Sequence, residues 1–263
     1  MKKILMLMMI AAGAFAFQGC SKGDMDSPSQ SPTQGNTGTG GTGTGTGGSM
    51  ARFTIAKDFL YIIQNDRLEV FSLANAAEPV HSSGMKLQGS EIETIFAFHE
   101  YLLMGTRSGM LIYSITNPSQ PVYVSTYAHI RRCDPVVAQG NYAYVTLRTG
   151  TDCGGTPVNE LQVIDISNMS SPSLVNTYPL SNPFGLGVDG NHLFVCDGTD
   201  GLKVFDNEDP ESLEMTNHIT GIETFDVIPY NNLLMVIGPD GLSQYDYSDI
   251  NYLKLLSTIP VTE

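Results

Sequence analysis

The sequence has no tryptophan and little positive charge. Among 263 residues, 13 are Lys or Arg and 27 are Asp or Glu, which gives a formal net charge of −14 at pH 7. No basic cluster is longer than the pair Arg131-Arg132. An acidic protein of this kind repels phosphate backbones, so a nucleic-acid partner is not expected. The absence of tryptophan also argues against the usual aromatic platform for stacking sugar rings.

Sequence motifs of several common catalytic and metal sites are missing too. The four cysteines show no CxxC spacing and do not cluster with the five histidines, which argues against a zinc site. There is no GxSxG motif, which argues against a serine hydrolase of the nucleophile-elbow type. Helical periodicity is absent outside the first 17 residues. The remaining chain is therefore expected to be all-β.

The N-terminus has the pattern of a secretory signal. Lys2 and Lys3 precede an apolar run over residues 4–17, which is too short to span a bilayer as a helix. The Gly19-Cys20 pair that follows resembles a bacterial lipobox, with Phe17 and Gln18 in place of the usual Leu and small residue, a pattern tolerated in Bacteroidota-like lipoproteins.

This resemblance implies that Cys20 is lipidated and anchors the mature protein to a membrane. The alternative is an ordinary secretory peptide with a chance cysteine. Ser21 stands where Asp would signal retention in the inner membrane, so the bacterial outer membrane is expected, and the side on which the protein faces stays open.

A low-complexity segment follows the predicted anchor. Residues 20–50 are mostly Ser, Gly, Thr, Pro and Gln, including the run TGTGGTGTGTGG, and cannot bury enough apolar surface to fold. We therefore expect a signal peptide over residues 1–19, a flexible tether over 20–50 and one folded domain over 51–263.

The folded part contains a unit that recurs five times. Each copy carries a similar phrase, as in LEVFSLANAAEP, MLIYSITNPSQP and LQVIDISNMSSP, and the aligned anchors are Phe71, Tyr113, Ile164, Phe205 and Tyr245. Their separations are 42, 51, 41 and 40 residues, so the third unit has an insertion of about ten residues. A period near forty built from short alternating runs is typical of propeller blades.

Each unit divides into four strands separated by turn residues. In the third unit the expected strands are Pro135–Ala138, Ala143–Leu147, Leu161–Ile166 and Leu174–Tyr178. Radial closure protects sheet edges that a linear stack would expose. The sequence therefore predicts an all-β, five-bladed β-propeller with four-stranded antiparallel blades.

The repeat also resembles a known family. The phrase LQVIDIS at Leu161–Ser167, with GNHLFV at Gly190–Val195 and LKVFD at Leu202–Asp206, resembles the LVIVD-repeat proteins. That resemblance implies a propeller-like fold and a bacterial surface or secreted location. It supplies no catalytic residues, so function has to be inferred from the site.

Two cysteines flank the inserted segment. In a four-stranded blade, the loop entering the first strand and the loop joining the second and third strands lie on one face. Cys133 is in the first kind of loop and Cys153 in the second. An oxidising compartment favours a disulfide between them, worth about 3 kcal/mol for a loop of this size, and two free thiols are the alternative. Cys196 alternates inward and is expected to be buried.

Charged residues are predicted to meet where the innermost strands begin. The equivalent positions are Arg52, Glu93, Asp134, Gly185 and Asp226, and a propeller gathers these strand starts around its axis. Three functions fit: glycoside hydrolysis by Glu93, Asp134 and Asp226, binding of Ca²⁺ by the same acids, or recognition of a ligand. The alternative is that Asp134 and Asp226 only cap turns.

The same face carries Arg107, Arg148 and Phe184. The arginines could grip an anionic or hydroxylated ligand through forked hydrogen bonds, or could be inherited repeat positions with solvated heads. We favour a non-enzymatic, lipid-anchored recognition module for an unidentified protein or glycan, without a resident cofactor. A carbohydrate-active enzyme is the alternative.

Overall fold

The computed structural model describes residues 48–88, 91–129, 135–149 and 158–261. Within these ranges the regular structure is entirely β, in five four-stranded antiparallel sheets that follow the chain order. The described part of the chain contains no helix that is long and apolar enough to cross a membrane.

The sheets are numbered here as blades 1 to 5. Their strands are, in blade 1, β1 (Phe53–Ala56), β2 (Phe59–Gln64), β3 (Arg67–Ser72) and β4 (Val80–Lys86); in blade 2, β5 (Ile92–Phe98), β6 (Tyr101–Thr106), β7 (Gly109–Ser114) and β8 (Val122–Ala128); in blade 3, β9 (Val136–Gln139), β10 (Tyr142–Leu147), β11 (Glu160–Asp165) and β12 (Ser173–Pro179); in blade 4, β13 (Leu186–Asp189), β14 (His192–Cys196), β15 (Leu202–Asp206) and β16 (Glu214–Ile219); in blade 5, β17 (Asp226–Tyr230), β18 (Leu233–Gly238), β19 (Gly241–Asp246) and β20 (Lys254–Pro260).

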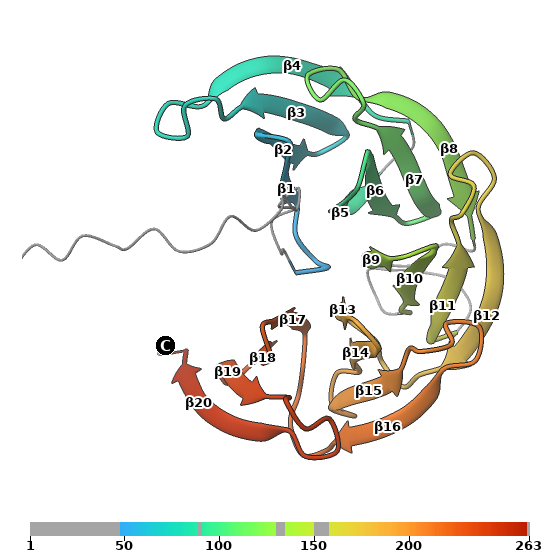
Figure 1. The fold of residues 1–263 in the computed structure, drawn as a ribbon, viewed down its shortest axis with the longest axis vertical. Helices are drawn as coiled ribbons and strands as arrows, with labels where there is room; N and C mark the ends of the chain where they lie inside the picture. Colours follow the sequence, from blue (N-terminus) through green and yellow to red (C-terminus); the bar gives the residue numbers. More distant parts are fainter. Residues whose placement is uncertain (1–47, 89–90, 130–134, 150–157, 262–263) are drawn as a thin grey trace, which may run out of the picture. The chain divides into compact units, whose positions relative to one another are not determined.

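The blades succeed one another around a common centre (Figure 1). In each blade the first strand lies innermost and the fourth outermost, and the chain then returns to the centre to begin the next blade. The predicted five-bladed β-propeller is therefore confirmed. The four strands predicted for the third unit agree with β9 to β12 to within one residue at each end.

The five repeat anchors share one structural position. In every blade the register between the third and fourth strands shifts immediately before the anchor, because one extra residue of the outer strand bulges out there. In blade 2, for example, Ile112 pairs with Ser125 and Tyr113 with Tyr123. A β-bulge bends its strand and increases the local twist. The repeated phrase thus marks the point where each outer strand begins to curve around the ring.

Aliphatic and aromatic side chains fill the spaces between consecutive blades. Four clusters of buried residues occupy the junctions 1–2, 2–3, 3–4 and 4–5. In the 4–5 junction, Phe194 and Cys196 of blade 4 meet Leu234 and Val236 of blade 5. Cys196 is a fully buried free thiol, as predicted, and burial raises its pKa far above the usual range. Burial of these faces is the main favourable contribution to folding.

A polar contact at the rim accompanies each of these four junctions. A Ser or Asn that follows the bulge in the outer strand donates a hydrogen bond to a backbone carbonyl in the turn between the third and fourth strands of the next blade. The four contacts are Ser83 Oγ to Ser119 (2.6 Å), Ser125 Oγ to Met169 (2.5 Å), Asn176 Nδ2 to Glu211 (3.1 Å) and Asn217 Nδ2 to Ile250 (2.9 Å). We call this contact the rim clasp.

Candidate functional site

The segment that enters β1 crosses the centre of the ring. Ser49 is 1% exposed; its Oγ donates to Asp226 Oδ1 at 3.0 Å and accepts a hydrogen bond from the Leu186 N–H at 2.8 Å. Two residues later, the Ala51 carbonyl accepts from the Ile95 N–H at 2.9 Å. The entering chain therefore links blades 5, 4 and 2. The predicted tether reaches residue 50, and its described end packs inside the ring.

Asp226 is enclosed by this segment rather than open to the mouth. It is 9% exposed, and a Cβ atom on Gly48 or Gly185 would lie 2.2 or 2.1 Å from its carboxylate oxygens, so a larger residue at either position would displace this carboxylate. Burial raises the pKa of Asp226, and hydrogen bonds from Val227 and from the entering segment partly offset this. The carboxylate is thus committed to holding the entering chain.

In blade 2, the residue equivalent to Asp226 lies one position later in the sequence than predicted. Strand pairing makes Thr94 the equivalent of Asp226, because the register between β5 and β6 is interrupted between Ile92 and Thr94. Glu93 lies at this irregularity. A bulge re-aims neighbouring side chains and leaves no hydrophobic pattern in the sequence, which explains the one-residue error.

The same difference holds in blade 3. The Pro135 carbonyl accepts from the Thr146 N–H, and this pairing places Pro135 where the prediction aligned Asp134. Asp134 itself lies outside the described residues.

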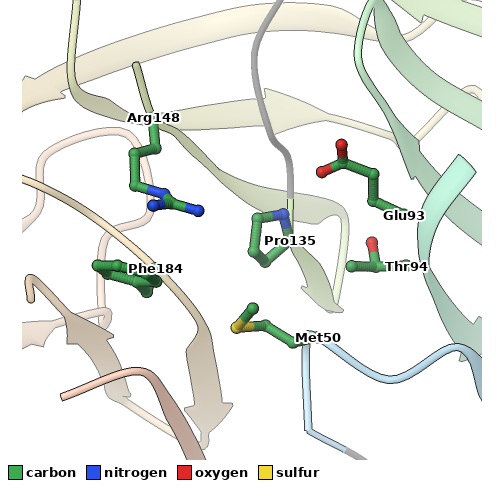
Figure 2. Close-up of a pocket in the computed structure, with 6 residues that line it drawn as sticks. All are labelled: Met50, Glu93, Thr94, Pro135, Arg148 and Phe184. Atoms are coloured by element: carbon green, nitrogen blue, oxygen red, sulfur yellow. The ribbon is translucent and has the colours of Figure 1, made fainter. Parts of the chain in front are cut away.

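A small cavity opens at the mouth (Figure 2). Its volume is about 100 Å³, and its lining consists of Met50, Glu93, Thr94, Pro135, Arg148 and Phe184. The Arg148 guanidinium carbon lies 4.0 Å from the centre of the Phe184 ring, in a cation–π arrangement. Phe184 is braced from behind by Phe225, with ring centres 5.3 Å apart. We call this space the mouth cavity.

A second, more open hollow shares Glu93 with the mouth cavity. It has a volume of about 400 Å³ and is lined by Arg52, Asn65, Asp66, Glu91, Ile92, Glu93 and Arg107. Arg107 binds two carboxylates: its Nε lies 3.3 Å from Glu93 and a terminal nitrogen lies 3.1 Å from Glu91. Arg52 is exposed and forms no ion pair with the described residues. We call this space the arginine hollow.

Most of the predicted binding residues therefore line two adjoining spaces. Arg52, Glu93 and Arg107 lie in the arginine hollow, and Glu93, Arg148 and Phe184 in the mouth cavity. Asp226 is among neither set of lining residues. Within the described ranges, no group of three or more His, Cys, Asp and Glu side chains is placed to hold a metal ion.

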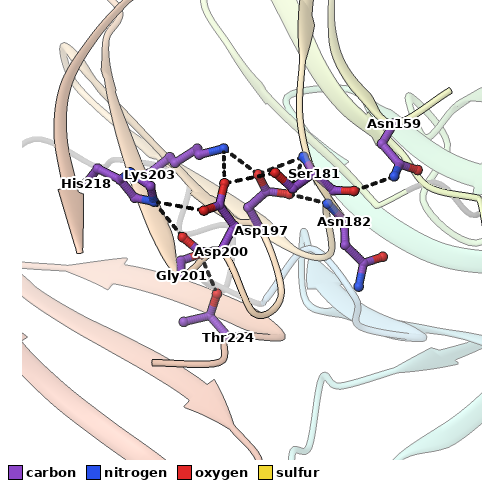
Figure 3. Close-up of polar contacts among 9 residues, drawn as sticks. All are labelled: Asn159, Ser181, Asn182, Asp197, Asp200, Gly201, Lys203, His218 and Thr224. Atoms are coloured by element: carbon purple, nitrogen blue, oxygen red, sulfur yellow. Dashed lines mark hydrogen bonds and ion pairs between the residues drawn. The ribbon is translucent and has the colours of Figure 1, made fainter. Parts of the chain in front are cut away.

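A buried ion pair on the same side of blade 4 was not anticipated (Figure 3). Asp197 is fully buried and accepts hydrogen bonds from Lys203 Nζ at 2.5 Å and from the backbone of Ser181 and Asn182. Lys203 also lies 2.7 Å from Asp200. Together they fix the β14–β15 loop to the segment that leads into β13.

These contacts shift two pKa values. Burial alone would lower the pKa of Lys203, but hydrogen bonds to Asp197 and Asp200 outweigh it and raise the pKa. Hydrogen bonds from Lys203 and Ser181 lower the pKa of Asp200. The sequence gives little indication of this ion pair. An acid at the end of a strand, followed by the Asp200-Gly201 turn and a lysine, is typical of an ordinary tight turn.

The insertion of the third unit falls between β10 and β11 in the sequence, and its ends, Thr149 and Asn159, are among the described residues. Its described base is held by Asn159, whose Oδ1 accepts from the Thr149 N–H at 2.9 Å and whose Nδ2 donates to the Ser181 carbonyl of blade 4. Cys133 and Cys153 lie outside the described residues, so the disulfide between them stays a prediction.

Fold and site together define a β-propeller with two adjoining hollows at its mouth. Residues 131–179, which include blade 3, match the LVIVD repeat family model, so the chain carries this repeat. No curated protein matches the sequence.

Solved structures share the fold at low sequence identity. A functionally unknown protein from Desulfotomaculum acetoxidans DSM 771 is 11% identical with a TM-score of 0.66, over 80% of this chain and 69% of that one. The periplasmic gluconolactonase PpgL of Pseudomonas aeruginosa is 13% identical with a TM-score of 0.59, over 78% and 68%. The computationally designed Ika8 protein is 13% identical with a TM-score of 0.57; the match covers 79% of this chain, which spans 60% of the designed chain.

Proposed function

We propose that this protein is a non-enzymatic recognition module that binds a hydroxylated or anionic small ligand, such as a sugar acid or the acidic end of a glycan, at its mouth. The observation that carries this proposal is the pairing of Arg148 over Phe184 in a cavity that adjoins, through Glu93, a second space with Arg52 and Arg107. The lining of the two hollows balances three arginines against Asp66, Glu91 and Glu93, so an anionic group would bind at the guanidinium groups themselves rather than in a field of positive charge.

The lining supplies the chemistry that such a ligand needs. A guanidinium binds a carboxylate with two parallel hydrogen bonds, and Arg52, which forms no ion pair with the described residues, can offer its donors to a ligand. Phe184 and Met50 offer apolar contact to the carbon side of a sugar ring. Glu93 can accept hydrogen bonds from hydroxyl groups. Few polar groups around an apolar floor are typical of a small-molecule site.

The cellular setting is part of the proposal. Lys2, Lys3 and the apolar run before Cys20 support export and lipid anchoring at a bacterial outer membrane. An oxidising compartment would favour the Cys133–Cys153 disulfide. Substitution of Cys20 by Ala should release the protein from membranes, and non-reducing peptide mapping should find Cys133 linked to Cys153. Membrane retention of the variant, or a bridge to Cys196, would contradict this setting.

The enzyme alternative uses Glu93, Asp134 and Asp226 as a carboxylate set, and the gluconolactonase neighbour gives it some support. However, a catalytic carboxylate must reach substrate, while Asp226 is 9% exposed and bound to Ser49. Glu93 is held by Arg107. These contacts favour binding over hydrolysis.

The test is binding of the mature chain to an array of neutral and acidic glycans, followed by calorimetry with the best ligand. We expect Arg148→Ala and Phe184→Ala to weaken binding by tenfold or more, while Lys254→Ala in the exposed outer strand β20 leaves affinity unchanged. Equal affinity in all variants would reject the mouth as the site. Release of product from a glycan, lost in Glu93→Gln, would favour the enzyme instead.

A further inference from the structure

The fifth side of the ring, between blades 5 and 1, differs from the four packed junctions. Figure 1 shows the β1–β4 and β17–β20 sheets standing apart on this side. At the centre, the two blades are linked through Ser49 and Asp226. We call the two facing surfaces, on blade 1 and blade 5, the open faces.

Matched positions show that the open faces are uncovered. Phe53 in β1 and Ile95 in β5 occupy equivalent positions opposite the second strand of their blades. Phe53 is 58% exposed, whereas Ile95 is 1% exposed. On blade 5, Ile237 occupies the position of Cys196 in blade 4, and their exposures are 38% and 0%. The apolar residues of the open faces include Phe53 and Ile55 on blade 1, and Leu233, Met235, Ile237 and Leu242 on blade 5.

Both halves of a fifth rim clasp are also present. Ser257 pairs with Gln244 in β19, the same position as Ser83 opposite Val70 in blade 1. Its Oγ donates to Gln244 Oε1 within its own blade at 3.0 Å, instead of reaching another blade. On the other side, the turn between β3 and β4 of blade 1 is closed by a hydrogen bond from the Glu78 N–H to the Asn75 carbonyl, like the other clasp turns, and its residues are exposed.

We propose that the open side is a docking site for a β-sheet of a partner protein: a blade-like sheet with aliphatic side chains on both faces and a polar rim. We infer this from the four packed junctions, because blades 1 and 5 present to the opening the same apolar faces and the same clasp positions that join neighbouring blades elsewhere in the ring. The proposal does not depend on ligand binding at the mouth.

Two positions of the open faces carry polar residues where other blades have apolar ones, which suits a surface that the partner does not always cover. Glu69 takes the position that Leu111 has in blade 2, and Gln244 the position of Val204 in blade 4. Polar groups on an otherwise apolar sheet surface oppose uncontrolled association. A second copy of this chain does not fit as well, because each of its blades is already flanked by its own neighbours or lies at its own open side.

Site-specific cross-linking tests whether the side is open. Ala76→Cys with Ser257→Cys places thiols on the two unmatched clasp halves, and Ser83→Cys with Ser119→Cys is the control at a packed junction. We expect a short bis-maleimide to join the control pair and not the open pair. An intramolecular link in the open pair would mean that the ring closes on itself. A link between two molecules would identify a second copy as the occupant. Either result overturns the proposal.

A sheet of known structure tests whether the space accepts a blade. The probe is the full chain extended after Pro260 by a second copy of residues 180–219, since Pro260 and Pro179 end equivalent outer strands. We expect the melting temperature to rise by about 5 °C or more, with slower amide exchange in β1 and β18. The same extension with Phe194→Asp and Leu193→Asp in the added copy should give no rise. No rise with the unaltered copy, or equal rises with both, would refute a blade-shaped site.

Discussion

Ser49 and Asp226 are 177 residues apart in the chain and share a buried 3.0 Å hydrogen bond at the centre of the ring. The bond joins the entry into blade 1 to the first strand of blade 5, on the side where the two blades do not pack directly. Stability of the ring at this side therefore depends on a polar contact, whereas the other four junctions depend on apolar packing.

Removal of the Ser49 hydroxyl should destabilise the protein. Ser49→Ala leaves the Leu186 N–H without its acceptor and removes one of several donors to Asp226, and a buried unsatisfied group costs about 1–3 kcal/mol. Urea unfolding should show this loss. Ser257→Ala, an exposed serine in β20, should change the unfolding free energy by less than about 0.5 kcal/mol. Equal effects of the two substitutions would mean that the entering segment does not hold the ring.

Asp226 should make stability depend on pH in a defined direction. Its pKa is raised in the folded state, so the folded protein binds this proton more readily than the unfolded chain. The charged form thus costs stability above the folded pKa, and that cost fades as pH falls toward the ordinary value of 3.8. Asp226→Asn lacks this titration. Relative to the variant, the wild type should gain stability as pH is lowered; a constant difference would contradict the assignment.

Loss of the Lys203 charge should be costly. Lys203→Met leaves the buried Asp197 without its cation, and breaking a buried pair costs about 3 kcal/mol or more. Lys86→Met, which removes an exposed ion pair with Asp66, should cost less than about 1 kcal/mol.

The Lys203 effect should also have a pH window. The raised pKa of Lys203 gives stability below its ordinary value of 10.5, which is lost as pH rises through the folded value. The lowered pKa of Asp200 gives stability above 3.8, which is lost as pH falls through the folded value. The difference between wild type and Lys203→Met should therefore be constant between about pH 4 and 10 and shrink outside that range. A difference independent of pH would contradict the ion-pair account.

Equivalent positions on packed and open faces should respond differently to truncation. Ile95→Ala empties part of a sealed junction and should cost about 2–5 kcal/mol. Phe53→Ala, at the matching position of the open face, should cost less than about 1 kcal/mol in the isolated protein, because its ring is 58% exposed. Chemical denaturation of both variants checks this. Comparable losses would indicate that blade 1 is covered in solution.

The sequence was sufficient to predict the five-bladed architecture because each repeat contains the signals for one blade. Alternation, turn dipeptides and the five anchors are local signals, and each anchor follows a bulge that curves its blade. The mouth was harder to predict. Because of a bulge before Thr94, Glu93 lies one position away from the predicted one. Asp226 binds Ser49, a residue that the composition had placed in the tether. Neither the open side nor the Asp197–Lys203 pair has a sequence signature, since both depend on how blades are placed in space.

The most direct test of ligand binding at the mouth is a titration followed through the Met50 methyl group, which lines the mouth cavity. In methyl-labelled protein, Met50 is assigned by its loss in Met50→Leu, and the probes are gluconate, galacturonate, glucuronate and their neutral sugars. The account predicts that at least one acidic probe shifts the Met50 signal in a saturable way, and that the shift is lost in Arg148→Ala. A signal unmoved by every probe, or moved equally in Arg148→Ala, would contradict it.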